Sequence, residues 1–242
     1  MSDRASSRVD PSPNDCIYVV DDDLVMHDLL RLAFKTVGLG VAAFTSPIEF
    51  IEKFDPGRPA CVILDLQMPE MDGIETLSLL RRRSGTTPVI FLTGYGDLTA
   101  AVRAMKLGAV EFLEKPVNKG LLLECVQRWL QYDIRAHQAV TRREATMVRL
   151  AKLSGRQRQV LDCVLGGMSN KEIARHLGVS PKAIEVHRAH LMQKMGARNL
   201  VSLVVDVVGC LSWTNRSEDR PPYPARVDGR GLLGGASADR LR

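Results

Sequence analysis

The stretch Ile17-Tyr18-Val19-Val20-Asp21-Asp22 is a short apolar run that ends in two adjacent acids. Further short apolar runs follow along the chain at residues 61–64, 89–92 and 111–113. Buried runs of this length that alternate with helical patterns indicate a parallel β-sheet. The first part of the chain is therefore predicted to be a doubly wound α/β domain.

Each of these predicted strands carries a polar side chain at or just after its carboxyl end. The residues concerned are Asp21, Asp22, Asp65, Thr93 and Lys115. Ligands of open parallel sheets bind outside the carboxyl ends of the strands, so we expect these side chains to share one pocket. Each has an ordinary explanation when taken singly, such as acids in the first turn of a helix. Their joint position at the strand ends favours a functional pocket.

The residue types in this pocket suit phosphoryl transfer. Adjacent carboxylates repel one another unless a cation lies between them, and Mg²⁺ binds through a few carboxylates, waters and phosphate oxygens. We therefore predict that Asp21 and Asp22 hold the metal. Asp65 ends a strand in a loop and is the candidate nucleophile, because carboxylates form aspartyl phosphates. Lys115 would supply a point charge and Thr93 a hydroxyl, which neutralise and position the phosphoryl group.

The residues around the pocket resemble the receiver domain of two-component response regulators, over roughly residues 14–132. The matching motifs are Val20-Asp21-Asp22, Asp65 with Met68-Pro69 and Asp72-Gly73, Thr93-Gly94, and Lys115-Pro116. The resemblance implies that a histidine kinase phosphorylates Asp65. It also implies that Asp22, Asp65 and the Gln67 carbonyl hold Mg²⁺, with Asp21 assisting through water.

The resemblance assigns one further role, to an aromatic residue. Phe112 occupies the switch position, where the ring turns inward as Thr93 closes on the phosphate. Taken from the sequence alone, Phe112 fits an ordinary core position, and that alternative stays open.

Charge is distributed unevenly along the chain. Residues 14–132 hold 12 Lys/Arg and 16 Asp/Glu, whereas residues 133–211 hold 13 and 6. A basic second half predicts a polyanionic partner, with a phosphate backbone as the first candidate. The five cysteines have no CxxC spacing and are expected to be buried thiols in a reducing compartment. With neither a secretory signal nor a membrane-spanning stretch apparent, we expect a cytoplasmic protein without a membrane partner.

Helix capping signals divide the basic second half. Ser154, Ser169 and Ser180-Pro181 each precede a helical pattern, and a further helix follows from Asn199. The second and third patterns are joined by a short turn that contains Gly178, which is typical of a helix-turn-helix. A small helical bundle with solvated charge is the plain alternative.

The helix that begins at Pro181 has two predicted faces. Ile184, Leu191 and Met195 are expected to face the core. The opposite stripe, expected to enter the major groove, consists of Lys182, Glu185, Val186, Ala189 and Gln193. The flanking side chains expected to reach phosphates are Lys171, Arg188, His190 and Lys194.

These segments are similar to the LuxR-type helix-turn-helix of the NarL/FixJ class of regulators, over roughly residues 153–208. The similarity rests on Ser169-Asn170-Lys171-Glu172-Ile173-Ala174, Gly178-Val179-Ser180 and Ile184-Glu185-Val186-His187-Arg188. The segment Gly94-Tyr-Gly-Asp97, with Ala101-Val102, Ala104-Met105-Lys106 and Gly108-Ala109-Val110, most resembles the FixJ branch. Ala183-Ile184 departs from the family's usual threonine and valine, and this change removes one hydroxyl that could contact a phosphate or a cap.

We therefore predict a five-stranded doubly wound receiver followed by an all-α four-helix domain. The predicted divisions are a disordered start at 1–13, the receiver at 14–132, a helical linker at 133–152, the LuxR-type domain at 153–211 and a disordered tail at 212–242.

The two predicted domains together indicate a transcription regulator that is switched by phosphorylation. We expect it to activate transcription. The expected partners are a sensor histidine kinase, promoter DNA, a second copy of the chain and RNA polymerase. No turnover activity is expected beyond the receiver's own phosphorylation. Three alternatives stay open. The unphosphorylated receiver could sequester the DNA-binding domain instead of dimerising on phosphorylation, and the protein could repress transcription instead of activating it. The chain could also be a phosphorelay intermediate or an interaction module with a vestigial DNA-binding domain.

Overall fold

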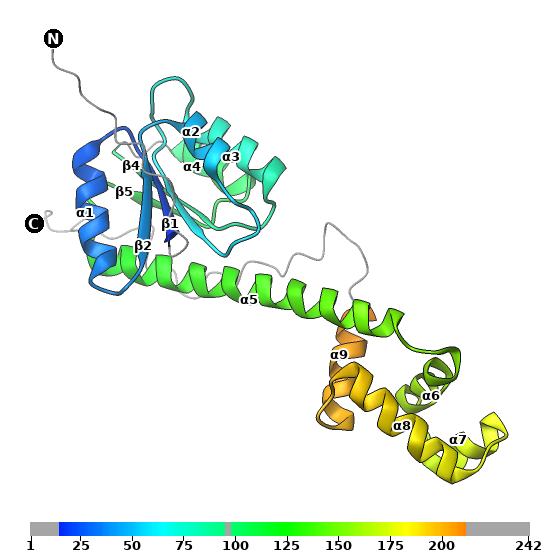
Figure 1. Cartoon of the computed structure of the whole chain (residues 1–242). Helices are drawn as coiled ribbons and strands as arrows, with labels where there is room; N and C mark the ends of the chain where they lie inside the picture. The colour runs from blue at the N-terminus through cyan, green and yellow to red at the C-terminus, as the bar shows by residue number, and fades with distance from the viewer. Residues whose placement is uncertain (1–14, 95–97, 212–242) are drawn as a thin grey trace, which may run out of the picture.

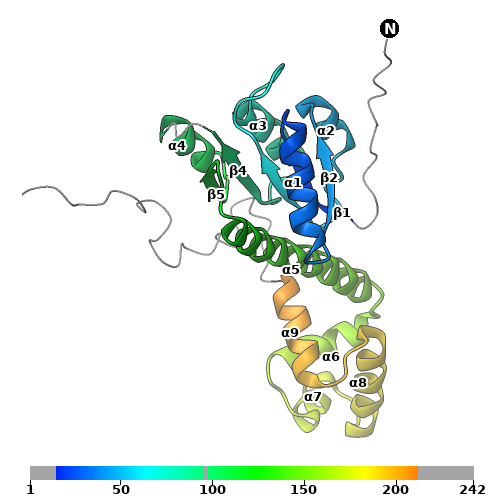
Figure 2. The ribbon, with the colours of Figure 1, turned by 90° about the vertical axis from the view of Figure 1, so that its left-hand side faces the viewer.

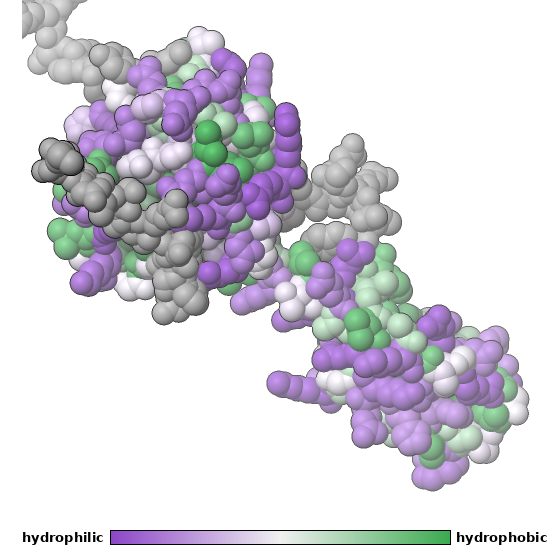
Figure 3. Space-filling view, turned by 45° about the horizontal axis from the view of Figure 1, so that its top comes forward, coloured by the Kyte–Doolittle hydropathy of each residue, from purple (hydrophilic) through white to green (hydrophobic). Residues whose placement is uncertain are grey.

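The structure is a computed structural model that describes residues 15–94 and 98–211 of the 242-residue chain. It consists of an α/β lobe and a smaller helical lobe, joined by one long helix (Figure 1). The predictions of disorder at 1–13 and 212–242 lie outside the described residues, as do residues 95–97 of the FixJ-like segment. In the view of Figure 3 both lobes present mainly hydrophilic surface with small hydrophobic patches.

The first lobe is built on a five-stranded sheet in the order β2-β1-β3-β4-β5, and all pairs are parallel. The strands are β1 (Asp15–Val20), β2 (Gly40–Phe44), β3 (Cys61–Leu64), β4 (Val89–Thr93) and β5 (Glu111–Glu114). This arrangement confirms the predicted doubly wound sheet. The edge strand β2 was not located from the sequence, although residues 41–44 form an apolar run; unlike the runs at β1, β3 and β4, it is only partly buried and no pocket residue follows it.

Helices cover both faces of this sheet. They are α1 (Leu24–Lys35), α2 (Pro47–Lys53), α3 (Gly73–Arg83), α4 (Leu98–Lys106) and α5 (Lys119–Ala151). Side chains alternate between the faces of a strand, so Tyr18 belongs to the apolar layer that includes residues of α2, α3 and α4, whereas Ile17 belongs to the layer that includes residues of α1 and α5. Two apolar layers therefore hold the sheet in place and leave its carboxyl edge open.

The helix α5 extends well beyond the receiver lobe. It has 33 residues, so it is about 50 Å long, and it runs without a break through the range predicted as a linker. The second lobe contains α6 (Gly155–Leu165), α7 (Asn170–Leu177), α8 (Pro181–Met195) and α9 (Leu200–Leu211). Its helix α9 packs against α5 (Figure 2). The Cys210 thiol of α9 donates to the Arg143 carbonyl, in the distal half of α5.

The predicted capping signals define the helices of the second lobe. Ser154 and Ser169 form capping boxes with Gln157 and Glu172, and Ser180 accepts from the Ala183 amide. Gly178 ends α7 with φ of 67°, a conformation that favours glycine. Within the described part of the chain, no helix has both the length and the apolar character needed to cross a membrane.

Candidate phosphoacceptor pocket and nucleic-acid interface

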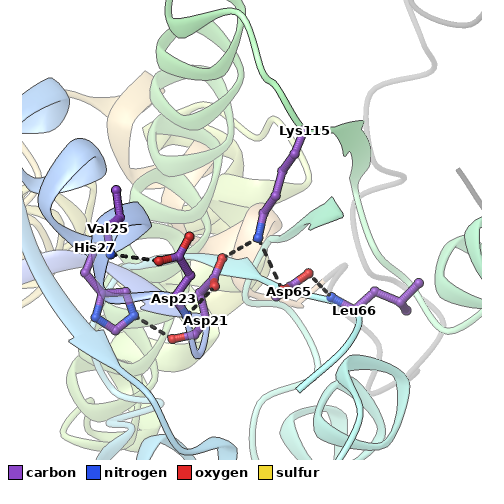
Figure 4. A network of polar contacts seen from close by, with 7 residues as sticks. All are labelled: Asp21, Asp23, Val25, His27, Asp65, Leu66 and Lys115. Atoms are coloured by element: carbon purple, nitrogen blue, oxygen red, sulfur yellow. Dashed lines mark hydrogen bonds and ion pairs between the residues drawn. The ribbon is translucent and has the colours of Figure 1, made fainter. Parts of the chain in front are cut away.

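The carboxyl edge of the sheet gathers polar residues from the ends of four of its strands, and Figure 4 shows three of them, Asp21, Asp65 and Lys115. Asp21 follows β1 and Asp65 follows β3, while Thr93 is the last residue of β4 and Lys115 follows β5. Backbone hydrogen bonds continue past the strands, since the Asp65 amide donates to Val20 O at 2.9 Å and the Lys115 amide donates to Thr93 O at 2.7 Å. The pocket residues are therefore fixed by the sheet itself.

Lys115 joins two of the acids. Its Nζ lies 2.7 Å from Asp21 Oδ2 and 3.2 Å from Asp65 Oδ2. The Asp21 side chain is 3% exposed and the Asp65 side chain 11% exposed, so these charges are partly shielded from water. The other oxygen of Asp65, Oδ1, accepts the Leu66 amide at 2.7 Å. Both oxygens of the Asp65 carboxyl group therefore have a partner, and these two contacts orient the group.

Burial and the neighbouring charges act on the pKa values of this pair. Burial raises the pKa of the Asp65 carboxyl, the Lys115 ammonium opposes this rise and the Asp21 charge adds to it. Burial lowers the pKa of the Lys115 ammonium, but the hydrogen bonds and charges of Asp21 and Asp65 together outweigh burial, so the pKa is raised overall. Lys115 therefore stays charged and can neutralise an incoming phosphoryl group.

Three carboxylates lie close enough together to hold one cation. The oxygens that Asp21, Asp22 and Asp65 can offer lie within 4.8 Å of one another, and Asp22 is exposed while the other two are buried. Hard oxygen ligands on an open edge suit Mg²⁺, which keeps several waters and binds phosphate oxygens. The residues present therefore fit the predicted metal.

Substitution of the exposed acid tests this fit. Asp22→Ala removes one carboxylate without disturbing the buried pair, so Mg²⁺ affinity should fall by roughly tenfold or more, measured by titration calorimetry. Asp28→Ala is the matched control, because Asp28 is exposed one turn further along α1 and lies outside the cluster. Equal affinities for Asp22→Ala and the wild-type protein would contradict the assignment.

The remaining predicted site residues of the first lobe are Gln67, Thr93 and Phe112. Gln67 is exposed two residues after Asp65, and Thr93 is buried at 1% exposure. Phe112 is half-buried and stacks on Phe91, with ring centroids 5.9 Å apart. This position on the core edge of β5 is compatible with both predicted roles of Phe112, switch and core.

Sequence reasoning missed the residues that support Asp21. The ring of His27 is buried, and its Nε2 lies 2.7 Å from Asp21 O. The Asp23 amide donates to Asp21 Oδ1 at 2.9 Å, and the Asp23 carboxylate caps α1 through the Val25 amide. The position of His27 in the first turn of α1 was the available signal, because that turn faces the end of β1.

The helix α8 of the second lobe has the two faces that its sequence predicts. Ile184, Leu191 and Met195 are buried at 0%, 1% and 3% exposure. The predicted stripe is exposed throughout, at Lys182, Glu185, Val186, Ala189 and Gln193. Lys182 Nζ pairs with Glu185 Oε2 at 2.8 Å, and exposed pairs of this kind are weak enough to open for a ligand.

The flanking cations differ in what they contact. Lys171 and His190 are exposed, whereas Arg188 donates to Asn170 Oδ1 at 2.9 Å. The ammonium of Lys194 donates to Gln157 Oε1 at 2.9 Å and to Lys152 O at 3.2 Å. Lys194 therefore ties α8 to the end of α5 and the start of α6, a role that its sequence position did not reveal.

The first lobe, an α/β sheet with an acidic pocket, has the architecture of a receiver. The second lobe, in which α7 and α8 are joined by a short turn and α8 has an exposed face, has that of a helix-turn-helix unit. Residues 17–127 match the family described as "Response regulator receiver domain", and residues 151–207 match "Bacterial regulatory proteins, luxR family".

Several relatives are similar to this chain over most of their own length. The chain is 39% identical to the transcriptional regulatory protein FixJ of Bradyrhizobium diazoefficiens over 78% of its own length and 92% of that protein. It is 34% identical to the response regulator protein TodT of Pseudomonas putida over 84% of this chain and 86% of that one. The solved structure of the response regulator StyR is similar, with 37% identity, a TM-score of 0.68, and coverage of 79% and 96%.

The chain belongs to the NarL/FixJ class of response regulators, which join a receiver to a LuxR-type DNA-binding domain. The chain is thus a response regulator with a LuxR-type DNA-binding domain, and its family is one of transcription regulators rather than of enzymes.

Proposed function

We propose that phosphorylation of Asp65 by a sensor histidine kinase switches this protein between states that differ in DNA binding. The observation that carries the proposal is the geometry around Asp65, where one carboxylate oxygen is held by the Leu66 amide and the other faces Lys115. In the transfer step, Asp65 forms a bond to phosphorus while the bond from phosphorus to the kinase histidine breaks. Lys115 neutralises charge on the phosphoryl oxygens, and Thr93 offers a hydroxyl to one of them.

The pocket is proposed to work with Mg²⁺ bound. Asp21, Asp22, Asp65 and the Gln67 carbonyl would hold the ion, which offsets the negative charge of the acids and of the phosphoryl oxygens. Asp21 is already paired with Lys115 at 2.7 Å, so it supports the ion best through water.

We further propose that the phosphorylated protein dimerises, binds promoter DNA through α8, and activates transcription with RNA polymerase in the cytoplasm. An isolated half-site contact is weak, and two linked reader helices gain affinity from their joint binding. The exposed stripe of α8 and its flanking cations supply the chemistry that base edges and phosphates require.

Self-association is the first test of this switch. The candidate interface contains Val102, Met105, Lys106 and Phe112. Val102 and Met105 on α4 are 46% and 39% exposed, and Phe112 lies on β5, the strand that pairs with β4 and its Thr93. Phosphodonor plus Mg²⁺ should raise the sedimentation coefficient and the affinity for DNA together. A monomer that gains DNA affinity would contradict dimerisation and favour relief of autoinhibition. A protein whose DNA affinity is unchanged would overturn the proposed switch.

Sequence readout is the second test. Glutamate accepts from cytosine N4, so Glu185→Ala should relax preference at one base pair by about 1–3 kcal/mol per half-site. Lys171→Ala should weaken binding to all sequences about equally and lower the salt slope by about 1. Binding-site selection at several salt concentrations measures both. If Lys171→Ala changes the selected motif and Glu185→Ala leaves it intact, the orientation of α8 is wrong.

A further inference from the structure

A buried acid lies far from the phosphorylation pocket, at the point where α5 leaves the receiver. Asp133 has no exposed surface, and its Oδ2 accepts the Ala60 amide at 2.9 Å. Burying a carboxylate away from water costs folding free energy, and a protein with a well-packed apolar residue of similar volume at such a position is often equally stable. The acid therefore contributes a directional bond between α5 and the loop that precedes β3.

A histidine one turn further along α5 extends this contact. His137 Nδ1 lies 3.0 Å from Asp133 O and 3.4 Å from Asp133 Oδ2, while Nε2 lies 3.3 Å from Pro56 O. The ring thus bridges the helix and the same loop. Residues 56–60 are held at both ends, through Pro56 and Ala60.

The position of this contact relates it to both lobes. Ala60 immediately precedes β3 and Asp65 immediately follows it, so the two ends of one strand are separated by about 16 Å. A groove lined by Gly57, His137, Arg142 and Asp206 continues from the loop along α5 to α9. The contact of Asp133 and His137 with residues 56–60 therefore lies between β3, which Asp65 follows, and α9, the helix of the second lobe that packs on α5.

We propose that Asp133 and His137 are positioning residues, which latch α5 to residues 56–60 and fix the direction in which the helix carries the second lobe. The purpose of this latch rests on the proposed function. A receiver can hold a DNA-binding domain in one reproducible orientation only if the joint between the two is rigid. The bonds at residues 56–60 supply this fixed joint, and the continuous helix α5 supplies the rigid arm beyond it.

Four variants of the full chain test the latch. Asp133→Leu keeps the branched shape of the side chain, with two bulkier methyl groups, and removes the acceptor, whereas Asp133→Asn keeps an acceptor oxygen for the Ala60 amide. His137→Ala removes the second contact from a side chain that is 22% exposed, so it tests the latch even if Asp133→Leu does not fold. Gln138→Ala is the matched control, because Gln138 is exposed at the next position of α5.

Structural readouts test the joint directly. Hydrogen exchange of the Ala60 amide should quicken by roughly tenfold or more in Asp133→Leu, and Asp133→Asn should restore most of the protection. Small-angle scattering should show a broader distribution of distances between the lobes for Asp133→Leu and His137→Ala, but not for Gln138→Ala. Wild-type exchange and scattering in both latch variants would overturn the proposal.

Functional readouts separate the latch from the proposed function. The rate of labelling by a small-molecule phosphodonor should be unchanged, because the pocket lies at the other end of β3. The gain in DNA affinity on phosphorylation should fall by roughly threefold or more in Asp133→Leu and His137→Ala. If the wild-type protein shows no such gain, the proposed function fails, whereas exchange and scattering still decide the latch. An undiminished gain in both variants would overturn the latch as a positioning device.

Discussion

Asp65→Asn is expected to abolish labelling by a small-molecule phosphodonor such as acetyl phosphate. An amide is not a nucleophile under these conditions, so no acyl phosphate can form at this position. The substitution keeps the shape of the side chain, and its amide oxygen can still accept the Leu66 amide that Oδ1 accepts at 2.7 Å. Lys115 also keeps its shorter contact, to Asp21 at 2.7 Å. The loss should therefore come from chemistry and not from collapse of the pocket.

The measurement is the stoichiometry of acid-labile phosphate after incubation with phosphodonor and Mg²⁺. Asp28→Asn is the control, because this acid is exposed on α1 and lies outside the cluster. It should label as fully as the wild-type protein. Stoichiometric labelling of Asp65→Asn would mean that another residue is the phosphoacceptor and that the pocket was assigned wrongly.

Much of the fold could be predicted because patterns in short stretches of sequence mark the same residues that are buried or that cap helices in the folded protein. Continuous apolar runs mark β1, β3 and β4, which are buried on both faces. Serines at helix starts mark α6, α7 and α8 because a hydroxyl caps free amides wherever the helix lies. The two faces of α8 follow from helical period alone, and the buried positions agree.

Contacts between distant segments could not be predicted in the same way. Asp133 meets the Ala60 amide across 73 positions, and in sequence it resembles an ordinary acid on an exposed helix. The carbonyl partners of Lys194 depend on how α8 meets the end of α5, which no local pattern encodes. The clustering of Asp21, Asp65 and Lys115 was predictable because parallel strands bring their carboxyl ends together, but the closer pairing of Lys115 with Asp21 was not.

Substitution of Gly73 is expected to have a second large effect, on stability and on phosphorylation, because this residue packs against the loop that carries the phosphoacceptor. It is the first residue of α3, is buried, and its amide donates to Leu66 O at 2.9 Å. A Cβ at this position would lie 2.2 Å from Asp65 O and 2.8 Å from Phe91 Cε1. The nearer atom belongs to the backbone, so the conflict can be relieved only by moving the chain at Asp65 or the start of α3.

Gly73→Ala should therefore impair both stability and chemistry. Forced overpacking of this kind lowers the free energy of unfolding by about 1–3 kcal/mol, which chemical denaturation measures. A displaced nucleophile loses its alignment, and a shift near 1 Å costs roughly 100-fold in rate, so labelling with phosphodonor should slow by roughly tenfold to 100-fold. Gly155→Ala is the matched control, because Gly155 is the first residue of α6 and an added Cβ there meets no atom within 4 Å. The control should change stability by less than about 0.5 kcal/mol and leave labelling unaltered. If Gly73→Ala labels at the wild-type rate, the close approach of α3 to Asp65 does not position the nucleophile.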